Sequence, residues 1–202
     1  LGSLSLIRYA FRFIGIPLGV VATSFATVLL PHFARIGVEN NAGLSFNLFE
    51  AIKFIIWFTI PVAYLMGLFS LEIFQTLYAS GAGMTEKIYI TQSIFLAFLA
   101  GLLFFSLNRV LLNVFYALGI PRVPFVVSVL SVVFNFFMNQ LLVQRYGATG
   151  IAFASTLAAT IQAIVYLVFL YMKLGLKFNY KKFGVFVRNC IRQWLVGFFM
   201  FF

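Results

Sequence analysis

Residues 4–30 read LSLIRYAFRFIGIPLGVVATSFATVLL, an apolar stretch that contains two arginines. Arg8 and Arg12 are one helical turn apart, so both would lie on the same face of a helix. An arginine at the centre of a bilayer costs about 3 kcal/mol or more, and such residues usually face a bundle interior or a wet cavity. The stretch therefore predicts a membrane helix of a transporter. The open alternative is that the two arginines snorkel to lipid head groups.

The rest of the chain has the same apolar character. Its 202 residues are 63% hydrophobic and 9% charged, a composition that excludes a soluble globular domain. A helix needs about 20 apolar residues to cross about 30 Å of hydrocarbon. We therefore expect an all-α integral membrane protein, a polytopic bundle of about six transmembrane helices that form one transmembrane domain over residues 1–202. The expected spans are residues 4–30, 51–71, 88–118, 123–143, 149–172 and 185–202.

Both ends of the chain lie close to apolar sequence. Residue 1 is Leu instead of an initiator Met, and the block 185–202 reaches the last residue. We therefore expect the chain to be a piece of a longer protein, cut at both ends.

Lysine and arginine are distributed unequally over the connections between the blocks. The connections 31–50, 119–122 and 173–184, with their flanks, hold nine basic residues, whereas the alternate connections hold Lys87 and Arg145. Cytoplasmic loops carry the excess of basic residues. We therefore expect these three connections to be cytoplasmic and the first block to enter the membrane from outside. The nine basic residues are Arg35, Lys53, Arg122, Lys173, Lys177, Lys181, Lys182, Arg188 and Arg192.

The formal net charge of +10 raises the question of a nucleic-acid partner. The basic residues lie beside the apolar blocks, so anionic lipid head groups are the expected partners and nucleic acid is not. Segment 173–192, KLGLKFNYKKFGVFVRNCIR, places basic residues at helical intervals between aromatic ones. Two interpretations stay open for it: an interfacial stretch that fixes topology, and a site for a specific lipid.

Few residues of the chain are suited to catalysis or metal binding. Cys190 is the only cysteine, His32 is the only histidine, and Asp is absent. The four glutamates fall in or beside connections, so no pair of carboxylates lies inside the membrane for acid–base work. Zinc sites need several Cys or His ligands. We therefore expect a transporter and not an enzyme, with no metal and no cofactor.

Small residues and prolines mark expected helix contacts and bends. Gly15 and Gly19 form a GxxxG pair in the first block, and small residues recur every four positions in the fifth, which lets helix backbones approach closely. Pro17 and Pro61 lack a backbone donor, so we expect them to kink the first and second blocks. The small residues of the fifth block are Gly150, Ala154 and Ala158.

Several asparagines lie inside the apolar blocks. Asn108 precedes Arg109, and Asn113 follows one turn later, which indicates a polar stripe on the third block. Asn135 and Asn139 lie one turn apart in the fourth block. Two interpretations stay open for these asparagines, hydrogen bonding between helices and lining of a cavity. Because no acidic residue lies within the blocks, we expect the counter-ion of the buried arginines to be a phosphate-bearing ligand, which arginine binds bidentately.

Three segments resemble the MurJ (MviN) lipid II flippases of the MOP exporter superfamily. Residues 8–35, RYAFRFIGIPLGVVATSFATVLLPHFAR, resemble the eighth transmembrane helix of that family and its exit. Residues 71–86, LEIFQTLYASGAGMTE, are similar to the external loop after helix nine. Residues 109–124, RVLLNVFYALGIPRVP, resemble the end of helix ten and the short basic loop after it. The chain therefore looks like helices eight to thirteen of a fourteen-helix, two-lobed transporter.

The resemblance implies a mechanism and a set of site residues. Flippases of this family move the undecaprenyl-diphosphate-linked peptidoglycan precursor from the cytoplasmic to the outer leaflet of the bacterial inner membrane by alternating access. Arg12 matches the cavity arginine implicated in engaging the lipid-linked diphosphate, and Arg8 and Arg109 are further candidates for that site. This chain departs from the pattern at Phe11 and Gly15, where relatives often carry Asp and Glu. The N-terminal lobe, which holds the family's other essential arginines, is expected to be a missing partner.

Two alternatives stay open beside the flippase. An exporter of polysaccharide-linked lipids or of drugs from the same superfamily would share the helices and the cavity, with less dependence on Arg12. A non-transporting membrane scaffold, or a degenerate remnant, would account for the lost acidic residues.

Overall fold

The computed structural model describes residues 3–19, 41–78, 85–174 and 180–201, and the described elements are all α-helices. The all-α fold class expected from the composition is therefore confirmed. The helices are α1 (Ser3–Pro17), α3 (Asn41–Leu68), α4 (Ser70–Tyr78), α5 (Thr85–Leu99), α6 (Leu102–Ala117), α7 (Arg122–Leu174) and α8 (Tyr180–Phe201).

Parts of several sequence predictions lie outside the described residues. These are the second half of the block 4–30, the first part of the connection 31–50 with His32, and residues 79–84 and 175–179 in the later connections. The described remainder of the connection 31–50 forms the first turns of α3.

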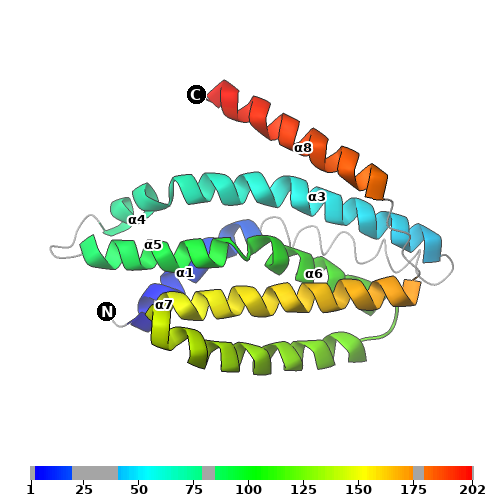
Figure 1. Cartoon of the computed structure of the whole chain (residues 1–202), viewed down its shortest axis with the longest axis horizontal. Helices are drawn as coiled ribbons and strands as arrows, with labels where there is room; N and C mark the ends of the chain where they lie inside the picture. Colours follow the sequence, from blue (N-terminus) through cyan, green and yellow to red (C-terminus); the bar gives the residue numbers. More distant parts are fainter. Residues whose placement is uncertain (1–2, 20–40, 79–84, 175–179, 202) are drawn as a thin grey trace.

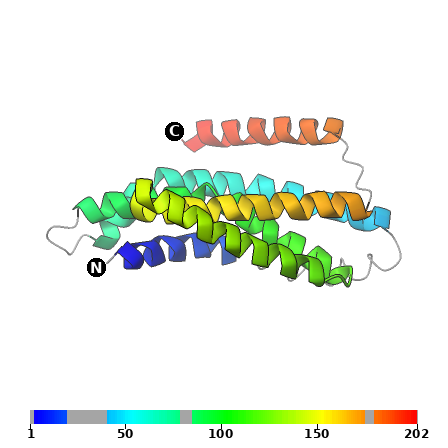
Figure 2. The ribbon, with the colours of Figure 1, turned by 60° about the horizontal axis from the view of Figure 1, so that its bottom comes forward.

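Most helices lie side by side with their long axes in a similar direction (Figure 1). Helix α1 packs mainly along α5, and α6 packs between α3 and α7. Helix α8 lies on the outer side of α3, separated from the other helices in both ribbon views (Figure 2). The indole N–H of Trp57 on α3 donates to Gln193 Oε1 on α8 at 3.0 Å, which ties the two helices together.

The buried apolar side chains form two separate clusters. The first core joins α1, α4, α5 and the middle of α7, and the second core joins α3, α6 and the rest of α7. The first core contains Leu6, Ala10, Ile14, Leu18, Phe74, Ile88, Ile94, Phe95, Ala97, Phe98, Leu99, Leu102 and Ala152. The second core contains Leu44, Leu48, Ala51, Ile52, Ile55, Leu107, Val110, Leu111, Val114, Phe115, Tyr166 and Leu170.

Helix α7 is two antiparallel arms joined at Gly147. This glycine has φ +56°, a left-handed conformation that residues with a Cβ rarely adopt, and the chain reverses there. We call residues 122–146 the first arm and residues 148–174 the second arm. The arms contain the apolar blocks 123–143 and 149–172, which the sequence separates at the same place.

Hydrogen bonds between the two arms form a polar ladder. As residue numbers rise along the first arm, those of their partners fall along the second, which is the register of an antiparallel helix pair. The ladder pairs are Pro124 O with Tyr166 Oη at 3.3 Å, Ser128 Oγ with Gln162 Nε2 at 3.1 Å, Ser131 Oγ with Ala158 O at 3.4 Å and Asn135 Nδ2 with Ser155 Oγ at 3.3 Å. The ladder fixes the register of two faces that are otherwise apolar.

Replacement of Tyr166 by Phe should lower the stability of the hairpin. The buried Tyr166 hydroxyl contacts Ser128 Oγ at 3.2 Å, Gln162 Nε2 at 3.0 Å and Pro124 O at 3.3 Å. Loss of the Tyr166 hydroxyl and its hydrogen bonds should reduce the free energy of unfolding by about 1 kcal/mol, measured by denaturant titration of the purified protein in detergent. The control is Tyr171→Phe, because Tyr171 is exposed on the same arm. Equal stability of the two variants would contradict a structural role for the ladder.

The small residues of the second arm form a packing face, as the sequence predicts. Gly150, Ala154 and Ala158 are buried, and a Cβ on Gly150 would lie 2.4 Å from the Leu142 backbone oxygen. The corresponding expectation for the GxxxG pair of the first block is wrong within the described residues. A Cβ on Gly15 or Gly19 would meet no described atom within 4 Å, because both face away from the first core.

Two apolar blocks are interrupted where the sequence predicts continuous helices. The block 88–118 is not one straight span, since α5 and α6 meet at Ala100 and Gly101 with a bend of 42°. The block 51–71 is interrupted at Phe69, after which α4 turns away. Pro61 lies inside an unbroken α3, so the interruption comes later than the proline, and Pro17 is the last residue of α1.

Length and apolar composition identify the helices able to cross a membrane among the described residues. These are α3 over Gly43–Leu68 and the α7 run Arg122–Lys173, with the bent pair of α5 and α6 as a third candidate. At 1.5 Å per residue the first arm of α7 is about 37 Å long and the second about 40 Å, so each is long enough to cross once. The assignment of each block as a membrane span stays a prediction, including the block 185–202 in α8.

Candidate functional site

Helix α1 has one buried face and one exposed face. Leu6, Ala10 and Ile14 recur every four residues and are buried in the first core. Arg8 and Arg12 follow the same spacing on the opposite side, and both are exposed. The apolar face fixes the rotation of the helix, and this rotation points the two arginines away from the first core.

Arg12 lines a groove between α1 and α4 with a volume of about 340 Å³. The remaining lining is apolar or aromatic, so Arg12 supplies the positive charge. The lining residues are Tyr9, Arg12, Phe13 and Ile16 from α1, and Phe74 and Leu77 from α4. Sequence reasoning missed the contribution of α4, because it treats residues 72–87 as a connection. The signal for a short helix is the pair of apolar residues Phe74 and Leu77, three positions apart.

Aromatic packing holds the wall of this groove in place. The ring of Phe13 packs edge-on against Phe74, with centroids 5.6 Å apart, and Phe74 packs in the same way against Phe95 of α5, at 5.4 Å. Phe74 is fully buried. Edge-to-face pairs are favoured by the ring quadrupoles, so they limit the positions available to each ring. The groove is therefore attached to the first core.

No described carboxylate neutralises the candidate arginines. Within residues 4–19, 43–77, 87–173 and 183–194, where side chains are described, the one ion pair joins Lys53 to Glu50. Arg8, Arg12 and Arg109 lie on other helices and are exposed. An arginine without an acidic partner keeps its five donors free for an anionic ligand.

Phe11, at a position where the resemblance implies an acidic residue, has a packing role. Its ring lies edge-on to Phe98 of α5, with centroids 5.3 Å apart. An aspartate at this position would lose that contact and would lie one residue from Arg12. The substitution therefore exchanges a local charge for packing between α1 and α5.

Arg109 lies on α6, on the exposed side of a helix whose buried side belongs to the second core. Its neighbour Asn108 donates from Nδ2 to the Ala159 carbonyl at 2.9 Å, which joins α6 to the second arm. Asn108 Oδ1 is buried and has no hydrogen-bond partner in the described part of the chain. Asn113 is half-buried further along α6. Arg109 is not among the residues that line the Arg12 groove, so the structure does not bring the two together there.

Asn135 and Asn139 contact one another in the first arm. Asn139 Nδ2 donates to Asn135 Oδ1 at 2.8 Å, and Asn135 in turn bonds Ser155 of the second arm. The Asn135–Ser155 bond joins the two arms, which is one of the two interpretations that the sequence leaves open, whereas the Asn139–Asn135 bond lies within the first arm. The assignment of these asparagines to the lining of a substrate cavity stays a prediction.

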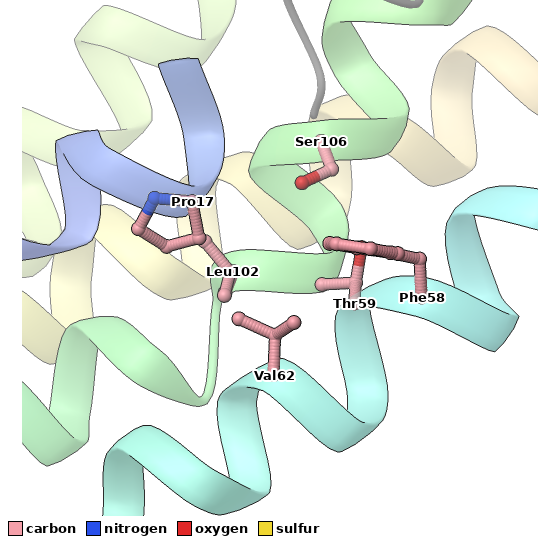
Figure 3. Close-up of a pocket in the computed structure, with 6 residues that line it drawn as sticks. All are labelled: Pro17, Phe58, Thr59, Val62, Leu102 and Ser106. Carbon is pink, nitrogen blue, oxygen red and sulfur yellow. The ribbon is translucent and has the colours of Figure 1, made fainter. Parts of the chain in front are cut away.

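A second, smaller cavity lies where α1, α3 and α6 meet (Figure 3). About 160 Å³ lies between its lining atoms, but no part of this space is wide enough for a water molecule. Pro17 closes it from α1, Thr59 and Val62 approach from α3, and Leu102 and Ser106 approach from α6. Thr59 and Ser106 are both buried, so two hydroxyl groups are placed in an apolar junction.

The family model described as lipid II flippase MurJ matches residues 1–201. This chain belongs to the MurJ family. The match extends over both cores and both arms of α7, so the resemblance of the three segments is confirmed for the chain as a whole. The MurJ family and the apolar helices indicate a bacterial membrane protein.

Individual MurJ relatives and a solved structure agree with this assignment. The chain is 29% identical over 180 residues to a probable lipid II flippase MurJ of Borreliella burgdorferi, covering 89% of this chain and 35% of the relative. It is 28% identical over 163 residues to the lipid II flippase MurJ of Thermosipho africanus, covering 81% of this chain and 33% of the relative. It also matches a lipid II flippase MurJ solved in an inward closed conformation, with 26% identity and a TM-score of 0.79 over 99% of this chain and 41% of that one.

The chain therefore spans about a third of the length of the curated relatives that it matches. Because the fold agrees over nearly the whole chain, the described helices correspond to a portion of the MurJ fold.

Proposed function

We propose that this chain is the C-terminal part of a lipid II flippase and that Arg12 binds the diphosphate of the lipid-linked substrate. The whole protein would move the undecaprenyl-diphosphate-linked peptidoglycan precursor from the cytoplasmic to the outer leaflet of the inner membrane. The observation that carries this proposal is the placement of Arg12 in a groove, exposed and without a described acidic partner, in a chain of the MurJ family.

The chemistry of the groove fits a diphosphate attached to an apolar tail. The Arg12 guanidinium presents planar donors that match two phosphate oxygens at once. The aromatic and aliphatic residues around it, including Tyr9 and Phe74, suit the sugar and isoprenoid portions on either side of the charge. Arg8, one turn away on the same exposed face, would add a second positive charge along the path.

Alternating access needs a second lobe, which would be the N-terminal part of the longer protein. Two lobes that rock around a fixed site expose it first to one leaflet and then to the other. In this arrangement Arg12 would bind the diphosphate from the C-terminal lobe. Arg109 would bind it when the site faces the end of α6. Membrane potential or an ion gradient would drive the cycle.

The basic connections would orient the protein and bind anionic lipid. The connections 31–50, 119–122 and 173–184 would be cytoplasmic, because they carry the excess of Lys and Arg. Lys53 lies 5.1 Å from the ring centroid of Phe49 and 5.8 Å from that of Phe186, which places one of these charges beside aromatic rings at the junction of α3 and α8. Anionic head groups are the proposed partners of this belt.

Complementation separates lipid II transport from the related alternatives. The full-length protein is expressed in one bacterium depleted of its own lipid II flippase, and in another that lacks its flippase for a polysaccharide-linked lipid. We expect growth and rod shape to be restored in the first strain and no export in the second. Restoration only in the second strain would assign a polysaccharide lipid, and failure in both at normal membrane levels would favour a non-transporting scaffold.

A further inference from the structure

The bend between α5 and α6 lies at the border of the two cores. Phe95 and Phe98, before the bend, are buried in the first core. Val110 and Leu111, after it, are buried in the second core. Leu102, the first residue of α6, still belongs to the first core, so the border between the two cores lies within the first turns of α6, just after the bend. The second arm of α7 contributes to both cores, through Ala152 to the first and through Tyr166 to the second, so a change of angle here would shift contacts along that arm.

The backbone hydrogen bonds at the bend leave one carbonyl without its helical donor. The Gly101 N–H donates to Phe98 O at 2.9 Å, three residues back, whereas a regular α-helix would use Ala97 O, four residues back. The Thr156 hydroxyl of the second arm donates to that same Ala97 oxygen at 2.8 Å. Ala97, Gly101 and Thr156 are all buried, so water does not replace either donor easily.

The side chain of Thr156 occupies the space that a residue other than glycine would need at position 101. A Cβ on Gly101 would lie 2.6 Å from Thr156 Oγ1 and 2.9 Å from Thr156 Cγ2. The hydroxyl therefore reaches Ala97 only because position 101 carries no side chain. Glycine at 101 and threonine at 156 act together to hold the bend.

The first turn of α6 borders a narrow cavity on its other side. Leu102 and Ser106 border the small cavity at the junction with α1 and α3 (Figure 3). The second arm, by contrast, is in close contact at Thr156.

We propose that the bend is a two-position hinge in which the Thr156 hydroxyl and the Gly101 N–H alternate as donors to the Ala97 carbonyl. In the bent position the Thr156 hydroxyl donates to the Ala97 carbonyl, and the Gly101 N–H donates to the Phe98 carbonyl. In the straighter position the Gly101 N–H donates to the Ala97 carbonyl, as in a regular helix, and the Thr156 hydroxyl no longer does. The use of this hinge rests on the proposed function: it would swing α1 and Arg12, which pack on α5, relative to Arg109 on α6.

Distance measurement between two spin labels tests the hinge in the full-length protein. The labels replace Tyr89 on α5 and Tyr116 on α6, both exposed, after replacement of the native cysteines, including Cys190→Ser. With a rise of 1.5 Å per residue, straightening a bend of 42° lengthens the distance between these positions by about 3 Å. Electron–electron double resonance in lipid nanodiscs resolves the two populations as a ratio.

Thr156→Val is the test variant and Thr156→Ser is the matched control. Valine keeps the volume of threonine but cannot donate a hydrogen bond, whereas serine keeps the hydroxyl. We expect Thr156→Val to raise the ratio of long to short distances about fivefold, the factor that corresponds to one hydrogen bond of about 1 kcal/mol. Thr156→Ser should retain the wild-type ratio. Equal ratios in all three proteins would overturn the hinge.

Gly101→Ala keeps the proposal falsifiable if Thr156→Val does not reach the membrane. Its Cβ would displace the Thr156 hydroxyl from Ala97, so the same increase in long distances is expected. A wild-type ratio in Gly101→Ala would overturn the hinge. The distances are measured without substrate, so they do not depend on the flippase assignment. Unchanged distances together with full complementation would refute the hinge alone, and shifted distances without complementation would refute the flippase proposal alone.

Discussion

Arg12→Ala and Arg12→Lys are both expected to abolish complementation of a bacterium depleted of its lipid II flippase. Alanine removes the positive charge from the groove between α1 and α4. Lysine keeps the charge but loses the planar fork that binds two phosphate oxygens. Loss of charge-assisted hydrogen bonds worth about 1.5–3 kcal/mol would slow transport by a factor of roughly 10 to 100. The measurement is growth and lysis on depletion, at matched membrane levels of each variant.

Arg145→Ala is the control for this experiment. Arg145 is exposed near the end of the first arm of α7 and does not line the groove, so its loss removes an equal charge from a different place. It should complement like the wild type. If Arg12→Lys also complements fully, the charge alone is sufficient and the bidentate contact is refuted. If Arg12→Ala complements, Arg12 is an anchor that snorkels to head groups and the site lies elsewhere.

Gly150→Ala should severely destabilise the α7 hairpin. The new Cβ would lie 2.4 Å from Leu142 O and 2.6 Å from the Leu142 carbonyl carbon, and these are backbone atoms that cannot rotate away. The two arms would have to separate close to their turn, which weakens the polar ladder beyond it. We expect a loss of about 3 kcal/mol in the free energy of unfolding, measured by denaturant titration in detergent, with reduced membrane levels in cells.

Gly184→Ala is the matched control for the hairpin. A Cβ on Gly184, in α8, would meet no described atom within 4 Å. The same chemical change there should stabilise the helix slightly, by up to about 1 kcal/mol, because alanine restricts the unfolded chain. Equal effects of the two substitutions would mean that the close approach of the two arms does not contribute to stability.

The sequence alone predicts the helical membrane class and most helix positions. These features are local, because in an apolar solvent each backbone group must find its partner within its own helix, so apolar length and helical spacing are sufficient. The resemblance to MurJ rests on short segments of the same kind, and the family match confirms it.

The tertiary structure decided the features that depend on residues far apart in the chain. The apolar block 88–118 contains no proline, yet it bends. At the bend the Thr156 hydroxyl, 59 residues away in sequence, donates a hydrogen bond to the Ala97 carbonyl. Gly15 and Gly150 look alike in sequence, but only Gly150 meets another backbone. The partner of Arg12 across the groove is a short helix that the sequence presents as a connection. Local periodicity determines which residues form helices, whereas contacts between helices determine where those helices break, which faces meet and where a charge is left open to a ligand.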